Sequence, residues 1–146
     1  MKKKILSILT LCIIASACDN NEMSLPGYVV HLEINILGEY PNFVLDNGIQ
    51  YLTFTEPKLA TDRLGCGGIL IVIYDRAYHA YDLACPREAN KNVIVAIDGL
   101  FAVCPKCGEA YDIYGGFGAP TKGINKLPLQ RYNCYYLSNG ILRITN

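Results

Sequence analysis

The 146-residue sequence contains no tryptophan and only two histidines. The lack of tryptophan gives little support to an aromatic cage or a carbohydrate platform. The two histidines, His31 and His79, are far apart in the sequence and form no cluster, and His79 is expected to be a hydrogen-bonded structural residue. A nucleophile elbow and a phosphate-binding loop are also missing. These residues therefore give no support to direct catalysis.

An excess of basic residues is missing as well. Lys2, Lys3 and Lys4 belong to the 13 Lys and Arg residues of the chain, so the sequence after them has 10, against 13 Asp and Glu. A protein that binds nucleic acid neutralises phosphates with a basic stripe, and no such stripe remains. Nucleic acid is therefore excluded as an expected partner.

The N-terminus has the pattern of an export signal. Its lysines precede an apolar stretch, residues 5–15, that is too short to cross a bilayer as a stop-transfer helix, and residues 1–17 are predicted to be a signal peptide. The small residues 15–17 run directly into Cys18 and resemble the lipobox of bacterial lipoproteins, in which the cysteine sulfur carries a diacylglyceryl group. An ordinary cleaved signal is the alternative. The resemblance implies a protein of the bacterial cell envelope, lipid-anchored to a membrane through Cys18.

The rest of the chain is long enough for one domain. Residues 18–27 begin with a polar run and are predicted to be a tether. Residues 28–146 can bury a single hydrophobic core without help from oligomerisation. They show no internal repeat and no second linker, so a single domain is predicted.

The pattern along this domain is β throughout. No segment combines a 3.6-residue apolar period with helix caps. Strand-length runs are instead separated by turn signals, among them Asp46-Asn47-Gly48, Asp98-Gly99 and Ser138-Asn139-Gly140. The run Ile69–Tyr74 is continuously apolar, which is typical of a strand buried on both faces. The other predicted strands are 28–36, 43–45, 50–54, 93–97, 100–103, 131–137 and 141–145. The sequence therefore predicts an all-β, antiparallel domain.

Seven cysteines occur in the chain, and two of them, Cys12 and Cys18, precede the domain. The domain itself contains Cys66, Cys85, Cys104, Cys107 and Cys134. An odd number cannot all be paired, and a domain of this size does not depend on disulfides. We expect Cys66 and Cys134 to be small core residues, because free cysteine is among the most buried residue types.

Two cysteine motifs flank the second predicted hairpin. The first reads Cys85-Pro86-Arg87, and the second, residues 104–112, reads CPKCGEAYD. This frame resembles the Rieske iron–sulfur family, whose two loops read C-x-H and C-x-x-H at about this separation, with two cysteines on one iron of a [2Fe–2S] cluster and two histidines on the other. The resemblance covers about residues 66–146, and residues 115–120 fall where the family has its covering loop. It implies a Rieske-like antiparallel β-sandwich with a small two-loop cluster-type subdomain.

The ligand positions depart from the family. Its histidine positions are occupied here by Arg87 and Cys107, and its serine donor position by Glu109. Arginine is permanently protonated and offers no lone pair to iron, so an ordinary Rieske cluster is excluded, although [2Fe–2S] is the cofactor that the resemblance implies. The candidate metal ligands that remain are three thiolates, those of Cys85, Cys104 and Cys107.

Two ways of completing this site stay open. Glu88 could be the fourth ligand of a tetrahedral zinc ion with three sulfurs. Alternatively, no metal is bound: the resemblance implies that the sulfurs of Cys85 and Cys104 are neighbours, and an exported protein meets an oxidising environment. A disulfide between Cys85 and Cys104, or between Cys85 and Cys107, would then brace the two loops.

Two functions are consistent with these residues. One is a redox or metal-binding module that uses the three cysteines, with electron transfer to a redox partner in the iron–sulfur case. The other is a binding or structural envelope protein that has kept the fold and lost the cluster, since fold likeness alone does not settle function.

Overall fold

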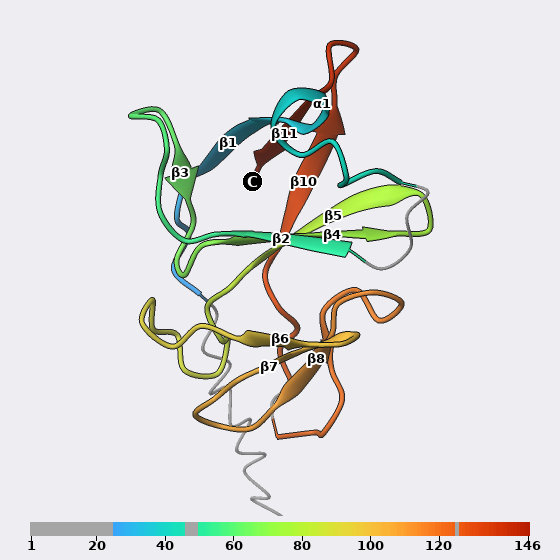
Figure 1. Ribbon diagram of the computed structural model, residues 1–146. Helices are drawn as coiled ribbons and strands as arrows, with labels where there is room; N and C mark the ends of the chain where they lie inside the picture. Colours follow the sequence, from blue (N-terminus) through green and yellow to red (C-terminus); the bar gives the residue numbers. More distant parts are fainter. Residues whose placement is uncertain (1–24, 46–49, 125) are drawn as a thin grey trace, which may run out of the picture.

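The computed structural model describes residues 25–45, 50–124 and 126–146, and these ranges form an antiparallel, almost entirely β structure (Figure 1). Its strands are β1 (Val30–Asn35), β2 (Gln50–Phe54), β3 (Arg63–Leu64), β4 (Ile69–Tyr74), β5 (Ala77–Asp82), β6 (Ala96–Asp98), β7 (Phe101–Val103), β8 (Ala110–Asp112), β9 (Ala119–Pro120), β10 (Arg131–Tyr136) and β11 (Ile141–Thr145). The predicted fold class, all-β and antiparallel, is confirmed. No helix within the described ranges has the length and hydropathy needed to span a membrane.

The strands form a large sheet and a small one. The large sheet has the order β2-β4-β5-β10-β11-β1-β3, and the small sheet has the order β6-β7-β8-β9. The large sheet folds over on itself, so that β1 and β11 face β2 and β4 across a shared apolar core. The small sheet lies beyond β2, β4 and β5, at the lower end of the view in Figure 1. The expected sandwich base with a smaller subdomain is therefore present.

Strand β4 separates two apolar cores. Ile69, Ile71 and Ile73 pack into the core of the large sheet. The alternate residues Leu70 and Val72 point the other way, into a second core shared with the small sheet. Successive side chains of a strand point to opposite faces, so this strand needs apolar residues at every position. The unbroken run Ile69–Tyr74 provides them, and burial on both faces is confirmed.

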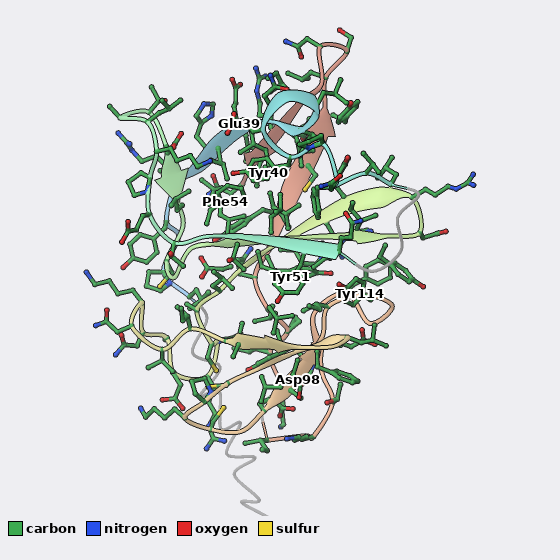
Figure 2. The ribbon with its side chains drawn as sticks, viewed as in Figure 1. Glu39, Tyr40, Tyr51, Phe54, Asp98 and Tyr114 are labelled. Atoms are coloured by element: carbon green, nitrogen blue, oxygen red, sulfur yellow. The ribbon has the colours of Figure 1, made fainter. Side chains whose placement is uncertain are left out.

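The small sheet is tied to the large one by backbone and side-chain contacts. Ala84, just after β5, forms an isolated antiparallel bridge with Ile94. The hydroxyl of Tyr114 donates to the carbonyl of Gln50 on β2 at 3.4 Å. In Figure 2 the labelled side chains Tyr51 and Tyr114 lie in the space between β2 and the small sheet. These links fix the loops around the small sheet relative to the sandwich.

Two predictions about local structure were wrong. Residues 43–45 are not a strand, and Gln50–Phe54 pairs instead with Ile69–Tyr74. A four-residue helix, α1 (Ile36–Glu39), follows β1 where none was expected, and the Asn35 side chain caps it by accepting from the Gly38 amide. The predicted turn at residues 46–48, the signal peptide and Cys18 lie outside the described residues.

A buried thiol and a buried tyrosine hydroxyl make the free energy of unfolding depend on pH in the alkaline range. Burial raises the pKa of the Cys134 thiol to about 12 from its ordinary 9.0, and burial likewise raises the pKa of Tyr81 to about 12 from 10.0. Each group is neutral in the fold at a pH where it ionises in the unfolded chain. Its stabilising contribution is complete below the unfolded pKa and is lost as the pH rises toward the folded one.

We therefore expect the free energy of unfolding to decline from about pH 9 upward, and to decline less steeply between pH 9 and 10 in Cys134→Ala. Tyr81 is present in both proteins and contributes equally to both slopes, so the difference in slope reports Cys134. Urea unfolding at a series of pH values measures both slopes. Parallel curves for the two proteins would contradict the assignment.

Candidate metal centre

The first cysteine loop leaves β5 and returns toward the small sheet. The amide of Cys85 donates to the carbonyl of Val93 at 3.0 Å, so the entry and the exit of the loop are joined. The amides of Glu88 and Ala89 both donate back to the carbonyl of Cys85. This tight turn fixes the direction of the Cys85 side chain, which is completely buried.

The second loop is the turn of the hairpin that joins β7 to β8. The amide of Cys104 donates to the carbonyl of Glu109 at 2.9 Å, and the amide of Gly108 donates to the carbonyl of Cys104 at 3.0 Å. Gly108 has φ of 74°, a left-handed conformation that glycine adopts without strain. The loop therefore holds Cys104 and Cys107 on one short turn.

The two loops bring three thiols to one point. The sulfur atoms of Cys85, Cys104 and Cys107 all lie within 4.8 Å of one another. The Sγ atoms of Cys85 and Cys107 are 3.8 Å apart. Cys85 comes from one loop and the other two cysteines from the second, so only the folded domain assembles this set. The convergence that the family resemblance implied is therefore observed.

The surroundings of the three sulfurs are mainly apolar. Cys85 and Cys104 are buried in the second core together with Val95, Ala102 and Ile113, and Cys107 is partly exposed beside them. Little water can reach the two buried sulfurs. Thiolates placed here would gain more from binding a cation than thiolates in water would.

Hydrogen bonds make the three sulfurs unequal. The Tyr111 hydroxyl lies 3.3 Å from Cys85 Sγ, and the Cys107 amide donates to Cys104 Sγ at 3.5 Å. Burial raises the pKa of the Cys104 thiol, but hydrogen bonds from the backbone of Cys107 and Lys106 and from neighbouring thiols outweigh burial, so its pKa is lowered overall. Burial raises the pKa of the Cys107 thiol to about 12. Cys104 is thus the thiol that ionises more easily of these two.

Arg87 and Glu88 both have partners other than the sulfurs. Arg87 is exposed, and its guanidinium donates to the carbonyl of Ile124 at 3.3 Å. Glu88 forms a salt bridge with Lys106, whose pKa is raised by its hydrogen bond to Glu88. The group of potential metal ligands among the described residues contains only the three cysteines, so Glu88 does not join it in this arrangement.

Glu109 has a role that the sequence did not reveal. It is completely buried, and its carboxylate accepts hydrogen bonds from the amides of Ala110, Thr121, Lys122 and Ile124 at 2.6–3.2 Å. The Rieske family has a serine, a hydrogen-bond donor, at the position that the resemblance aligns with Glu109. Here the Glu109 carboxylate is instead an acceptor, and it holds the segment 121–124 beside the second cysteine loop. The Lys122 ammonium adds a hydrogen bond to the carbonyl of Gly108.

A second buried carboxylate, Asp82, organises the glycine-rich stretch before β4. It accepts from the amides of Cys66, Gly67 and Ala84 at 2.7–2.9 Å and from the Tyr132 hydroxyl at 2.6 Å. A methyl group at Gly65 would collide with Asp82 Oδ2 and the Tyr132 hydroxyl. The stretch can thus wrap a carboxylate only because its residues are small.

The expected covering loop lies elsewhere than predicted. The ring of Phe117, in the loop after β8, packs edge-on against Tyr74 and His79 of the large sheet. The segment beside the cysteine loops is 121–124, through its bonds to Glu109 and Arg87. The segment that borders the cysteine loops therefore begins just after residues 115–120, the range that the resemblance implied.

The other candidate residues lie outside the site. His79 Nε2 lies 3.3 Å from the carbonyl oxygen of Tyr74, in keeping with the expected structural role. Cys134 packs against the core of the large sheet, as predicted, whereas Cys66 is partly exposed beside Asp82. All five cysteines of the domain are free thiols in this structure. The pairings of Cys85 with Cys104 or Cys107 stay predictions.

A [2Fe–2S] cluster does not fit these residues. Such a cluster needs four protein ligands, two on each iron. Three sulfurs lie within 4.8 Å of one another, and Arg87, which the resemblance sets at a ligand position, has no lone pair and bonds to Ile124 instead. Three thiols grouped in this way could hold a single thiophilic ion.

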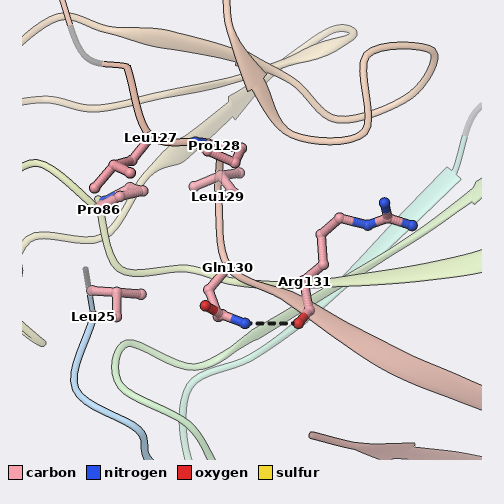
Figure 3. Close-up of a pocket in the computed structure, with 7 residues that line it drawn as sticks. All are labelled: Leu25, Pro86, Leu127, Pro128, Leu129, Gln130 and Arg131. Carbon is pink, nitrogen blue, oxygen red and sulfur yellow. Dashed lines mark hydrogen bonds between the residues drawn. The ribbon is translucent and has the colours of Figure 1, made fainter. Parts of the chain in front are cut away.

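An apolar groove of about 330 Å³ adjoins the first cysteine loop (Figure 3). Its walls are Leu25, Pro86, Leu127, Pro128, Leu129, Gln130 and Arg131. Leu25 is the first described residue, and Pro86 directly follows Cys85. The groove therefore shows that the chain enters the domain on the side of the first cysteine loop.

Comparisons with known proteins add one similarity of fold. No protein-family model matches the sequence, and no curated protein matches it. A chain in the solved complex of reduced oxygenase and oxidised ferredoxin in carbazole 1,9a-dioxygenase aligns over 66% of this chain and 80% of its own length, at 15% identity and a TM-score of 0.42. A match at this level says nothing about function.

Proposed function

We propose that this chain is a lipid-anchored module of the bacterial cell envelope in which Cys85, Cys104 and Cys107 bind one metal ion. The observation that carries the metal site is the convergence of three free thiols from two separate loops to within 4.8 Å. Thiolates at this spacing suit one ion with sulfur distances of about 2.3 Å. The motif frame and the converging loops support a divergent Rieske-type domain that has exchanged its cluster for a single ion.

A disulfide brace is the second candidate function of the same residues. It is favoured by the 3.8 Å distance between the sulfurs of Cys85 and Cys107, together with an oxidising envelope. A disulfide needs a sulfur–sulfur bond of about 2.05 Å, so the loops would have to approach by almost 2 Å. A metal ion can bridge the observed spacing, and we therefore place metal binding first.

Metal analysis together with thiol counting distinguishes the two candidates. The full chain, purified anaerobically in detergent, is expected to carry about one metal ion, to lack inorganic sulfide and the red-brown colour of [2Fe–2S], and to lose the metal in Cys107→Ser. Cys66→Ser is the matched control, because Cys66 lies outside the site. If the protein carries no metal and the domain contains three reactive thiols and one disulfide, the disulfide brace is supported and metal binding is contradicted. Stoichiometric iron with sulfide would overturn both.

Membrane attachment rests on the lipobox-like sequence that ends at Cys18. Cys18→Ser is expected to move the protein from the membrane fraction to the soluble envelope fraction, because the serine oxygen cannot take the thioether-linked lipid. Fractionation followed by immunoblotting measures this. Retention of the processed variant in the membrane fraction would show that Cys18 is not the anchor.

The position of Leu25 determines which side of the domain an anchor at Cys18 would hold near the membrane. The short segment from Cys18 to Leu25 can reach at most about 25 Å, and Leu25 lies in the groove beside Pro86. An anchor at Cys18 would therefore keep the first cysteine loop near the membrane surface. A redox or envelope protein partner would meet the site there.

A further inference from the structure

The three sulfurs form a ligand set that the described residues do not complete. Among the described His, Cys, Asp and Glu side chains, the only group of three or more whose ligand atoms all lie within 4.8 Å of one another is Cys85, Cys104 and Cys107. An ion held by three sulfurs in a plane at about 2.3 Å requires sulfur–sulfur separations of about 4.0 Å. The 3.8 Å between Cys85 and Cys107 fits such an ion. The other two separations are at most 4.8 Å, so three-coordinate binding needs only small shifts of the sulfurs.

The carboxylates that lie within three residues of a site cysteine in the sequence are engaged elsewhere. Glu88 pairs with Lys106, and its side chain is only 12% exposed. The carboxylate of Glu109 accepts four backbone amides, and that of Asp82 accepts three amides and the Tyr132 hydroxyl. A fourth ligand from any of them would cost an ion pair or several hydrogen bonds.

This arrangement discriminates between thiophilic ions. Zinc in protein sites is almost always four-coordinate and would need the Glu88 carboxylate or a water molecule as its fourth ligand. Copper(I) is a soft d¹⁰ ion that thiolates bind strongly and that is satisfied by three of them. Two of the three sulfurs are buried among apolar side chains, so water can approach the ion only from the side of the partly exposed Cys107.

We infer that the three-cysteine site selects copper(I) over zinc, with Lys106 withholding the Glu88 carboxylate from the ion. This inference rests on the proposed metal-binding function. Glu88→Gln should then leave copper(I) affinity unchanged within about threefold. Replacement of Lys106 by leucine, which has no atom that binds metal, frees Glu88, so it should tighten zinc binding tenfold or more while changing copper(I) affinity little.

The test uses the reduced, metal-free full chain in detergent. Copper(I) is supplied as its bicinchoninate complex and zinc with a chromophoric chelator, so that each affinity comes from competition. We expect one copper(I) per chain, retained against a hundredfold excess of zinc, and X-ray absorption showing three sulfur neighbours and no oxygen. Cys107→Ser should lower copper(I) affinity at least a hundredfold, whereas the control Cys66→Ser should not change it.

The possible outcomes distinguish a failure of copper(I) selectivity from a failure of the proposed metal-binding function. Zinc that binds as tightly as copper(I), or zinc affinity that falls tenfold in Glu88→Gln, would overturn the selectivity while keeping the metal site. Copper bound by only two sulfurs would overturn the three-coordinate geometry. Binding of neither metal, with Cys107→Ser behaving like the unaltered protein, would remove the metal function itself.

Discussion

Replacement of Asp82 by alanine is expected to lower the free energy of unfolding by about 4 kcal/mol. The substitution removes the acceptor of four hydrogen bonds, from the amides of Cys66, Gly67 and Ala84 and from the Tyr132 hydroxyl. Asp82 is completely buried, so water cannot replace these bonds without opening the fold. Each buried donor left unpaired costs about 1–3 kcal/mol. Urea unfolding monitored by circular dichroism measures the loss.

Two further substitutions keep this prediction informative if Asp82→Ala does not fold. Tyr132→Phe removes one of the four bonds and should cost about 1.5 kcal/mol. Asp98→Ala is the matched control, because Asp98 is an exposed aspartate near a turn of the small sheet (Figure 2) and should cost under 0.5 kcal/mol. A loss below about 1 kcal/mol in Asp82→Ala would contradict the role assigned to the carboxylate.

Glu109→Ala is expected to have the second largest effect, a loss of about 3 kcal/mol. Its carboxylate holds the amides of Thr121, Lys122 and Ile124, and these residues are themselves exposed. Once released, their amides can turn to water, so the cost is smaller than at Asp82. Hydrogen exchange at residues 121–124 should accelerate more than exchange in β4, because the loss of anchoring is local.

The control for Glu109 is Glu56→Ala, which removes an exposed carboxylate and should leave both stability and exchange unchanged. The loss of stability in Glu109→Gln should lie between those of Glu56→Ala and Glu109→Ala. The glutamine side chain keeps one oxygen acceptor but turns an NH2 donor toward backbone amides. Equal exchange rates at residues 121–124 in Glu109→Ala and in the unaltered protein would show that the segment is held by other contacts.

The sequence predicted those parts of the fold that depend on local pattern. The apolar run Ile69–Tyr74 indicated a strand buried on both faces, and the turn signals at residues 98–99 and 138–140 placed two hairpins correctly. The hairpin expected around residues 46–48 was wrong because Gln50–Phe54 pairs with a strand that comes after it. The partner strand, Ile69–Tyr74, begins 15 residues after Phe54, and nothing in the sequence of residues 43–54 indicates a partner at that distance.

The convergence of the three cysteines could be predicted from the sequence, but the carboxylates that support their loops could not. The spacing of Cys85, Cys104 and Cys107 resembles a known frame, so their convergence could be expected. Asp82 and Glu109 looked like ordinary acidic residues, because the amides that they accept lie up to 16 residues away. The small residues around Cys66 were the available signal: they mark backbone that can curl closely around an anion.

The two faces of β4 have a consequence for how the molecule comes apart. Because one strand closes both cores, neither core can open without exposing the back of the other. Opening the domain is therefore expected to be a single cooperative event, and the cysteine loops cannot melt as an independent appendage. An ion that binds only the folded site then opposes unfolding of the entire sandwich, by an amount set by its concentration relative to its dissociation constant. Protease resistance of the β1–β11 strand pair, on the far side of the large sheet's core, would thus report whether the cysteines are occupied.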